Sequence, residues 1–242
     1  MILEIAANSV ASALAAQEGG AGRVELCTAL ELGGLTPSYA QIAMAREKLT
    51  IPLYVLIRPR AGDFLYSDLE FETMLRDIEA CAKAGCDGVV LGVLDADGRV
   101  DRPRCRSLIS AAGNMGVTFH RAFDLARDPL TALEDVIALG CERVLTSGAQ
   151  ASAIEGAELI RQLVELAAGR IVVMPGAGVV AGNLDKLREL TCAREFHASA
   201  KQQYPSNMQW QRPLVTDMQG GELRSDVEQI RIIIAVLSGS SV

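Results

Sequence analysis

Eight short apolar runs with β-branched residues recur along this chain of 242 residues and alternate with longer segments of helical periodicity. They follow one another at intervals of about 20–35 residues, the length of one strand–helix unit. The runs are Ile2–Ala6, Arg23–Cys27, Pro52–Arg58, Gly88–Leu94, Gly116–Ala122, Arg143–Ser147, Arg170–Met174 and Glu195–Ser199. Eight such units without a break in composition predict one (β/α)8 TIM-like barrel of parallel strands, a single domain over residues 1–242.

The segments between these runs carry ordinary helix-end signals. Ser67 is expected to cap a long third helix that Gly85 ends, and Pro129 suits the first turn of the fifth. The alternative fold is an open doubly wound sheet, which would be expected to carry Gly-x-Gly-x-x-Gly after its first strand; residues 6–10 contain no glycine. Residues 201–224 are polar and Gln-rich, and we predict a long irregular loop there that suits a lid or a subunit contact.

Charge and cysteine usage restrict the partners and the compartment. A formal net charge of −7, with no run of Lys and Arg, argues against nucleic acid and against an anionic membrane surface. The 6 cysteines are scattered and include no Cys-x-x-Cys pair, which favours a reducing compartment. No stretch reaches the roughly 20 apolar residues of a membrane span. We therefore expect a cytoplasmic protein with no membrane segment.

Strand parity predicts which side chains enter the barrel, because positions that face the helices should be apolar. In the sixth run, where parity is ambiguous, we expect Val144 and Thr146 to face inward. The polar side chains expected inside are Glu4, Glu25, Arg58, Thr118, His120, Thr146 and His197. Burying such groups without partners costs several kcal/mol each. Two interpretations remain: an internal ion-pair network in which Arg58 neutralises the glutamates, or a functional pocket, which the position of both histidines near strand ends favours.

The loops after the strands add a predicted anion site. Arg58 and Arg60 are expected to hold a carboxylate or phosphate as bidentate forks. The turn Gly176–Gly178 follows the seventh strand, the usual position of a phosphate in such barrels. The other residues expected to contact the anion are Thr118, Arg121, Thr146, Ser147 and Ser199.

Acid–base residues accompany this anion site. His120 and Glu25 are the candidate general acid and base, with His197 in reserve and Asp124 nearby. Schiff-base catalysis needs an internal lysine, and Lys201 alone lies near a predicted strand end. The pattern therefore favours an isomerase, epimerase or lyase that acts on a small anionic or phosphorylated substrate.

Several long motifs resemble those of the CutC family. They are Arg23–Cys27, Gly33–Ser38, Ile57–Phe64, Thr118–Asp124, Leu145–Gly148 and Gly176–Val179, and the similarity spans nearly the whole chain. The resemblance implies a cytoplasmic TIM-like barrel that forms a homodimer or a larger homo-oligomer. It also implies a link to copper homeostasis and Cu(I) binding.

One position departs from that family's pattern. Members often carry Leu-Glu-Ile-Cys in the first strand, where this chain has Leu3-Glu4-Ile5-Ala6. Cu(I) prefers thiolate and thioether ligands, so the lumen keeps Cys27 as its candidate metal ligand, with Met174 as a thioether partner. Two hypotheses follow: a copper-homeostasis protein, and an enzyme of acid–base chemistry on a small anion.

Overall fold

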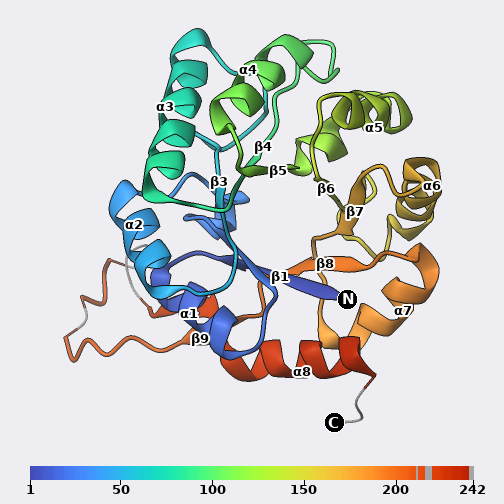
Figure 1. The fold of residues 1–242 in the computed structure, drawn as a ribbon. Coiled ribbons are helices and arrows are strands. Elements are labelled where there is room, and N and C mark those ends of the chain that lie inside the picture. The colour runs from blue at the N-terminus through green and yellow to red at the C-terminus, as the bar shows by residue number, and fades with distance from the viewer. Residues whose placement is uncertain (211, 216–219, 240–242) are drawn as a thin grey trace.

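A computed structural model describes residues 1–242 except 211, 216–219 and 240–242, and confirms the predicted (β/α)8 barrel (Figure 1). Its parallel strands are β1 (Ile2–Ala7), β2 (Arg23–Leu26), β3 (Leu53–Leu56), β4 (Gly88–Leu91), β5 (Gly116–Phe119), β6 (Arg143–Thr146), β7 (Val172–Pro175) and β8 (Glu195–Ala198). The hydrogen-bonded order is β7-β6-β5-β4-β3-β2-β1-β8, and β7 lies beside β8, so the sheet nearly closes on itself. Every strand lies on or within its predicted run apart from shifts of a residue or so at the ends.

Helices follow the strands and surround the barrel (Figure 1). They are α1 (Val10–Glu18), α2 (Tyr39–Lys48), α3 (Asp68–Ala84), α4 (Arg102–Ala112), α5 (Pro129–Ala138), α6 (Ala157–Ala167), α7 (Ala181–Thr191) and α8 (Val227–Ser238), with short 3-10 helices at Leu30–Leu32 and Arg121–Leu125. Ser67 begins α3 through a reciprocal capping box with Glu70, and Gly85 ends it with a φ of +77°. The predicted caps of α3 are therefore confirmed.

Two apolar clusters separate the outside of the sheet from its inside. Leu3, Ile5 and Phe119 belong to the large cluster between strands and helices. A small second cluster of Cys27, Tyr54, Leu56 and Val90 fills part of the lumen. This division confirms the parity predicted for the first, second, third and fifth strands.

The parity predicted for β6 was wrong. Val144 belongs to the outer cluster, whereas Leu145 lines the internal pocket and Arg143 bonds Glu195 inside the barrel. Thr146 turns away from the lumen and donates to Asp124. Each face of β6 carries one apolar residue, Leu145 beside Arg143 on one face and Val144 beside Thr146 on the other. The apolar pattern therefore cannot predict the parity of this strand, and the ion pair of Arg143 with Glu195 reveals it.

The segment after β8 is less irregular than predicted. Residues Lys201–Tyr204 form β9, which pairs antiparallel with β10 (Glu222–Ser225). The Asn8 side chain donates to the carbonyl of Leu223 at 2.6 Å and fixes this pair beside the start of α1. In the described part of the chain, no helix is long and apolar enough to cross a membrane.

Candidate functional site

A cavity of about 540 Å³ opens at the C-terminal ends of the strands. Its lining comes from β1, β2, β3, β6 and β8, from the segments after β2, β3, β5, β7 and β8, and from α8. Of the predicted site residues, the lining contains Glu25, Arg58, His120, Arg121, Gly178, His197 and Ser199. The sequence thus located the pocket, and the structure brings both histidines and Glu25 to it.

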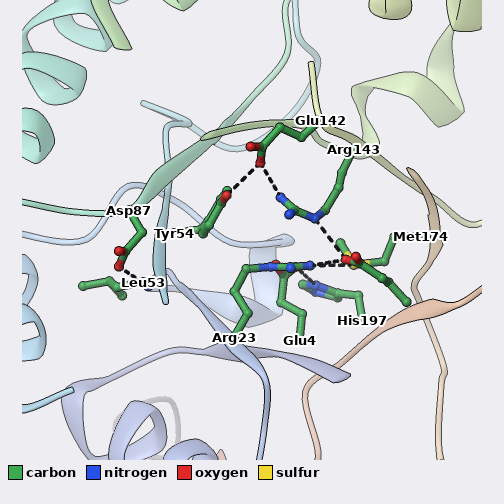
Figure 2. Close-up of polar contacts among 10 residues, drawn as sticks. Glu4, Arg23, Leu53, Tyr54, Asp87, Glu142, Arg143, Met174 and His197 are labelled. Atoms are coloured by element: carbon green, nitrogen blue, oxygen red, sulfur yellow. Dashed lines mark hydrogen bonds and ion pairs between the residues drawn. The ribbon is translucent and has the colours of Figure 1, made fainter. Parts of the chain in front are cut away.

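Three ionisable side chains from adjacent strands meet at this pocket, and two of them, Glu25 and His197, line it. Glu4 on β1, Glu25 on β2 and His197 on β8 each place a nitrogen or oxygen within 4.8 Å of the other two. His197 Nδ1 lies 2.7 Å from Glu4 Oε1, and the other Glu4 oxygen accepts from Arg23 (Figure 2). Parallel register explains the meeting, because Glu4 is paired with His197 on one side and with Arg23 on the other.

The charges of this group follow from its contacts. Burial acts to raise the pKa of Glu4, but the hydrogen bond from His197 and the charge of Arg23 outweigh it and lower this pKa to about 2. Burial acts to lower the pKa of His197, yet the charges and hydrogen bond of Glu25 and Glu4 leave it raised. An ionised Glu4 can only accept a hydrogen bond, so His197 carries a proton on Nδ1. Its Nε2 is left to the pocket.

Glu25 is the least satisfied carboxyl in the group. Its Oε2 is buried and has no hydrogen-bond partner among the described residues. Burial raises its pKa to about 7, against the opposing charge of His197. A carboxyl with this pKa exchanges its proton near neutral pH, which suits general acid–base work.

His120 contributes a neutral hydrogen-bond donor. Its Nδ1 accepts from the backbone of Ala122 at 3.2 Å, so the ring proton lies on Nε2, which has no partner in the described structure. Burial, followed by the charge of Arg58, lowers the pKa of His120 to about 3. His120 therefore fits the role of a donor to a bound oxygen better than the acid–base role first predicted for it.

Arg58 is held by backbone carbonyls and not by the glutamates. Its terminal nitrogens donate to Leu32, Gly34 and Gly62 at 2.8–2.9 Å, and its guanidinium lies 5.0 Å from the centre of the Phe64 ring. Its Nε is buried without a partner, and no described carboxylate forms an ion pair with it. The network in which Arg58 neutralises the glutamates was therefore wrong.

Arg23, and not Arg58, neutralises Glu4. The sequence analysis did not single out Arg23 for this role. Arg23 also donates to Glu195 at 2.8 Å, and Arg143 donates to Glu195 at 3.0 Å and to Glu142 at 2.8 Å. The Tyr54 hydroxyl donates to Glu142 at 2.8 Å (Figure 2). The missed signal was parity itself, since Arg23 is two residues before Glu25 and so shares its face.

Arg60 does not join the pocket. Its guanidinium donates to Asp63 at 2.9 Å and to the carbonyl of Leu65 at 2.7 Å in its own loop, and to Glu70 in the first turn of α3 at 2.6 Å. The predicted two-arginine clamp was wrong because local carboxylates and carbonyls already occupy this guanidinium.

Asp124 organises a loop beside the pocket. It accepts from the side chain of Thr146 and from both the backbone and hydroxyl of Ser147, and Arg121 donates to it at 2.8 Å. Arg121 alone of these four residues lines the cavity. Asp124, Thr146 and Ser147 therefore fix the loops after β5 and β6.

Thr118 and Gly176 lie beside the lining and not within it. Thr118 is fully buried and its hydroxyl has no partner in the described structure. A Cβ on Gly176 would lie 2.5 Å from Leu145 and 3.4 Å from His197, so glycine permits the close approach of β7.

A family model described as the CutC family matches residues 1–202 of this sequence. The chain belongs to the CutC family. A family protein CutC from Xanthomonas campestris pv. campestris strain B100 is 59% identical over 237 residues, which cover 98% of this chain and 99% of the relative. The copper homeostasis protein cutC homolog of Mus musculus is 48% identical over 214 residues, 88% of this chain and 79% of the relative.

Solved structures agree on the fold. The crystal structure of the CutC protein from Streptococcus agalactiae matches with a TM-score of 0.79 at 33% identity, and covers 82% of this chain and 98% of that one. Phosphoribosylanthranilate isomerase from Thermotoga maritima matches with a TM-score of 0.59 at 12% identity, over 99% of this chain and 100% of that one. The second likeness shows the barrel alone.

The motifs that resemble those of the CutC family meet at the pocket. Glu25, Arg58, His120 and Gly178 come from four separate motifs and four different strand ends, and all line the cavity. A TIM barrel brings the loops after its strands to one face, so distant motifs converge there.

The pocket offers poor ligands for Cu(I). Its described lining contains no cysteine, and the first strand contributes Ala6 to it. Cys27 is fully buried in the small lumen cluster, and burial raises the pKa of its thiol. The Met174 sulfur accepts from Arg23 at 3.4 Å. Glu4 is bonded to Arg23 and His197. The pocket therefore offers nitrogen and oxygen donors, whereas Cu(I) prefers sulfur.

Proposed function

We propose that this CutC-family protein takes part in copper homeostasis and that its barrel pocket binds a small anionic molecule and transfers a proton on it. The copper role is supported by the name of the mouse relative, a copper homeostasis protein cutC homolog. The pocket's role is supported by one observation: Glu25 Oε2, Arg58 Nε and His120 Nε2 are buried, unpartnered in the described structure, and belong to side chains that line one cavity.

Unpartnered buried polar atoms favour a ligand that supplies their partners. Leaving each unsatisfied costs about 1–3 kcal/mol, and a bound carboxylate or phosphate would remove that cost for the two donors. Arg58 adds a positive charge that no described carboxylate neutralises. Gly178, Ser199 and Lys201 also line the cavity, from the loops after β7 and β8, where phosphates bind in many TIM barrels.

Glu25 and His197 are the pair suited to move a proton. Glu25, with its pKa of about 7, takes a proton from a carbon acid bound against it. His197, protonated and held by Glu4, returns a proton from Nε2, while the His120 N–H and Arg58 stabilise the negative charge that develops on the ligand's oxygen. The net result is an isomerisation or epimerisation.

Cellular setting and assembly belong to the same proposal. We place the protein in the cytoplasm as a homo-oligomer, a dimer or a tetramer. Met208, Trp210 and Leu214, between β9 and β10, are exposed apolar side chains that suit a contact with a second copy. Light scattering on purified protein measures this, and a monomer at micromolar concentration would contradict it.

The pocket's chemistry is tested by deuterium exchange. Wild-type protein in D₂O, offered a panel of phosphorylated ketoses and 2-oxo acids, is expected to wash deuterium into the carbon next to the carbonyl of at least one of them. Glu25→Gln keeps the shape of the side chain and should lose the exchange by about 10²–10⁴-fold. Arg60→Met, which alters a guanidinium outside the pocket, is the matched control. Exchange that persists in Glu25→Gln would contradict the role of this carboxyl.

A further inference from the structure

Two buried thiols meet outside the barrel, at the C-terminal end of α3. The chain leaves α3 through Gly85, whose N–H donates to Ala82 at 3.1 Å, while the N–H of Cys86 donates to Cys81 at 3.1 Å. These two bonds define a Schellman motif, in which the residue after the glycine packs against the residue five positions earlier. Here those residues are Cys86 and Cys81, so the motif places their side chains against each other, and each thiol shifts the pKa of the other.

The surroundings of this thiol pair suit a bound cation. Both thiols are free, Cys81 is 0% exposed and Cys86 is 6% exposed, so the pair is shielded but reached from the side of Cys86. The charge of Arg46, which bonds the neighbouring Asp87, acts on Cys86. A singly charged metal bound by two thiolates carries a net charge of −1, and Arg46 would offset part of it, because its ion-pair partner Asp87 also acts on Cys86.

A site with two sulfur donors favours Cu(I) over zinc. Zinc takes four protein ligands in structural sites, and among the described residues the group of three or more such ligands is Glu4, Glu25 and His197, inside the barrel. Cu(I) prefers soft thiolates and accepts two of them in a linear arrangement. The pocket lacks sulfur donors, whereas this pair provides them.

We propose that Cys81 and Cys86 form a Cu(I) site on the outside of the barrel, at the end opposite the pocket. The proposal rests on the copper role proposed above and gives it a location. Binding replaces the two thiol protons, which pass to solvent, with one Cu(I), and the metal does not change oxidation state. The other described cysteines lack this arrangement: Cys105 donates to the carbonyl of Val93 at 3.7 Å, Cys27 lies in the lumen cluster, and Cys192 bonds Arg161.

The test is an anaerobic competition between fully reduced protein and a chromophoric Cu(I) chelator, with Cu(I) as the only metal. Wild-type protein is expected to withdraw one copper per chain. Cys81→Ser and Cys86→Ser should each lose more than about 100-fold in affinity, because even outer residues of a metal site cost 10–100-fold. Arg46→Met, which leaves both ligands in place, should lose about 10-fold. Cys105→Ser and Cys27→Ser, at equally buried sites, are the matched controls and should bind as the wild type does.

The outcomes separate the site from the copper role. If wild-type protein binds Cu(I) and both serine variants keep its affinity, the site is wrong and the copper role stands. If wild-type protein withdraws no copper from the chelator, the copper role itself fails. Should either serine variant fold poorly in urea melts, X-ray absorption of the wild-type complex decides: two sulfur ligands support the pair, and a shell of nitrogen and oxygen overturns it.

Discussion

The two ends of this barrel's interior hold the same kinds of polar side chain, but these are paired with one another at one end and lack partners at the other. Toward the N-terminal ends of the strands, Arg23, Glu195, Arg143 and Glu142 are joined in an unbroken series of ion pairs. Tyr54 completes it, with its ring 5.4 Å from the Arg23 guanidinium and 5.1 Å from that of Arg143 (Figure 2). At the mouth, Glu25, Arg58 and His120 each keep an unpartnered buried atom. The first arrangement is what a stable interior requires, and the second is what a ligand site requires.

Glu4 and His197 lie where the two regions meet. Glu4 bonds Arg23 in the paired region and His197 at the pocket. The series of ion pairs therefore ends at a histidine that lines the pocket. The paired end thereby fixes the orientation and charge of a residue at the unpaired end. One chain of polar contacts therefore joins the stabilising ion pairs to the pocket residues.

The largest expected effect follows from breaking the paired end. Arg23→Met would leave the buried Glu4 with His197 alone and Glu195 with Arg143 alone, and should lower the free energy of unfolding by about 3–5 kcal/mol. Urea melts at neutral pH measure the loss. Arg60→Met, which removes two partly exposed ion pairs, should cost about 0–1 kcal/mol in the same assay. Equal, small losses in both variants would mean that the internal pairs do not support the fold.

A smaller effect is expected from the pH dependence of Glu25. Its pKa of about 7 in the folded protein lies above the ordinary 4.5, so the folded state binds more protons between these values. Stability should therefore fall as pH rises from 4.5 through 7, by about 3 kcal/mol in total, since one pKa unit is worth about 1.4 kcal/mol. Glu25→Gln cannot ionise and should be more stable than the wild type by that amount at pH 8, and equal to it near pH 4.5.

Glu4 supplies the opposite dependence and hence an internal comparison. Its pKa of about 2 in the folded protein lies below the ordinary 4.5, so its contribution is complete above pH 4.5 and is lost as pH falls toward 2. The two windows do not overlap, and melts between pH 3 and 8 separate them. A Glu25→Gln variant that loses stability with rising pH just as the wild type does would place the proton elsewhere.

The sequence was enough for the barrel and for the position of the pocket, because strand spacing and parity are properties of the chain alone. It failed where partners decide the outcome. Arg60 has the same charge as Arg58 and stands two residues away, but only the structure reveals that Glu70 and Asp63 occupy it. Arg23 was overlooked because it is the first residue of its strand and was taken as the strand's end, although it lies on the same face as Glu25. The pKa values that separate His120 from Glu25 depend on burial and neighbouring charge, which no local pattern encodes.

The smallest expected change in stability belongs to His120, and it decides whether the mouth is a ligand site. His120→Leu removes an unpartnered buried nitrogen and keeps an apolar group beside Phe64, at the cost of the cap to Ala122. These effects oppose each other, so the free energy of unfolding should change by no more than about 1 kcal/mol. Inorganic phosphate, followed by thermal shift, should stabilise the wild type and Arg60→Met but not His120→Leu. A loss of about 3–5 kcal/mol in His120→Leu would instead mark a structural network at the mouth. An equal phosphate shift in all three proteins would also contradict the ligand site, since the His120 donor would then serve the fold and not a bound anion.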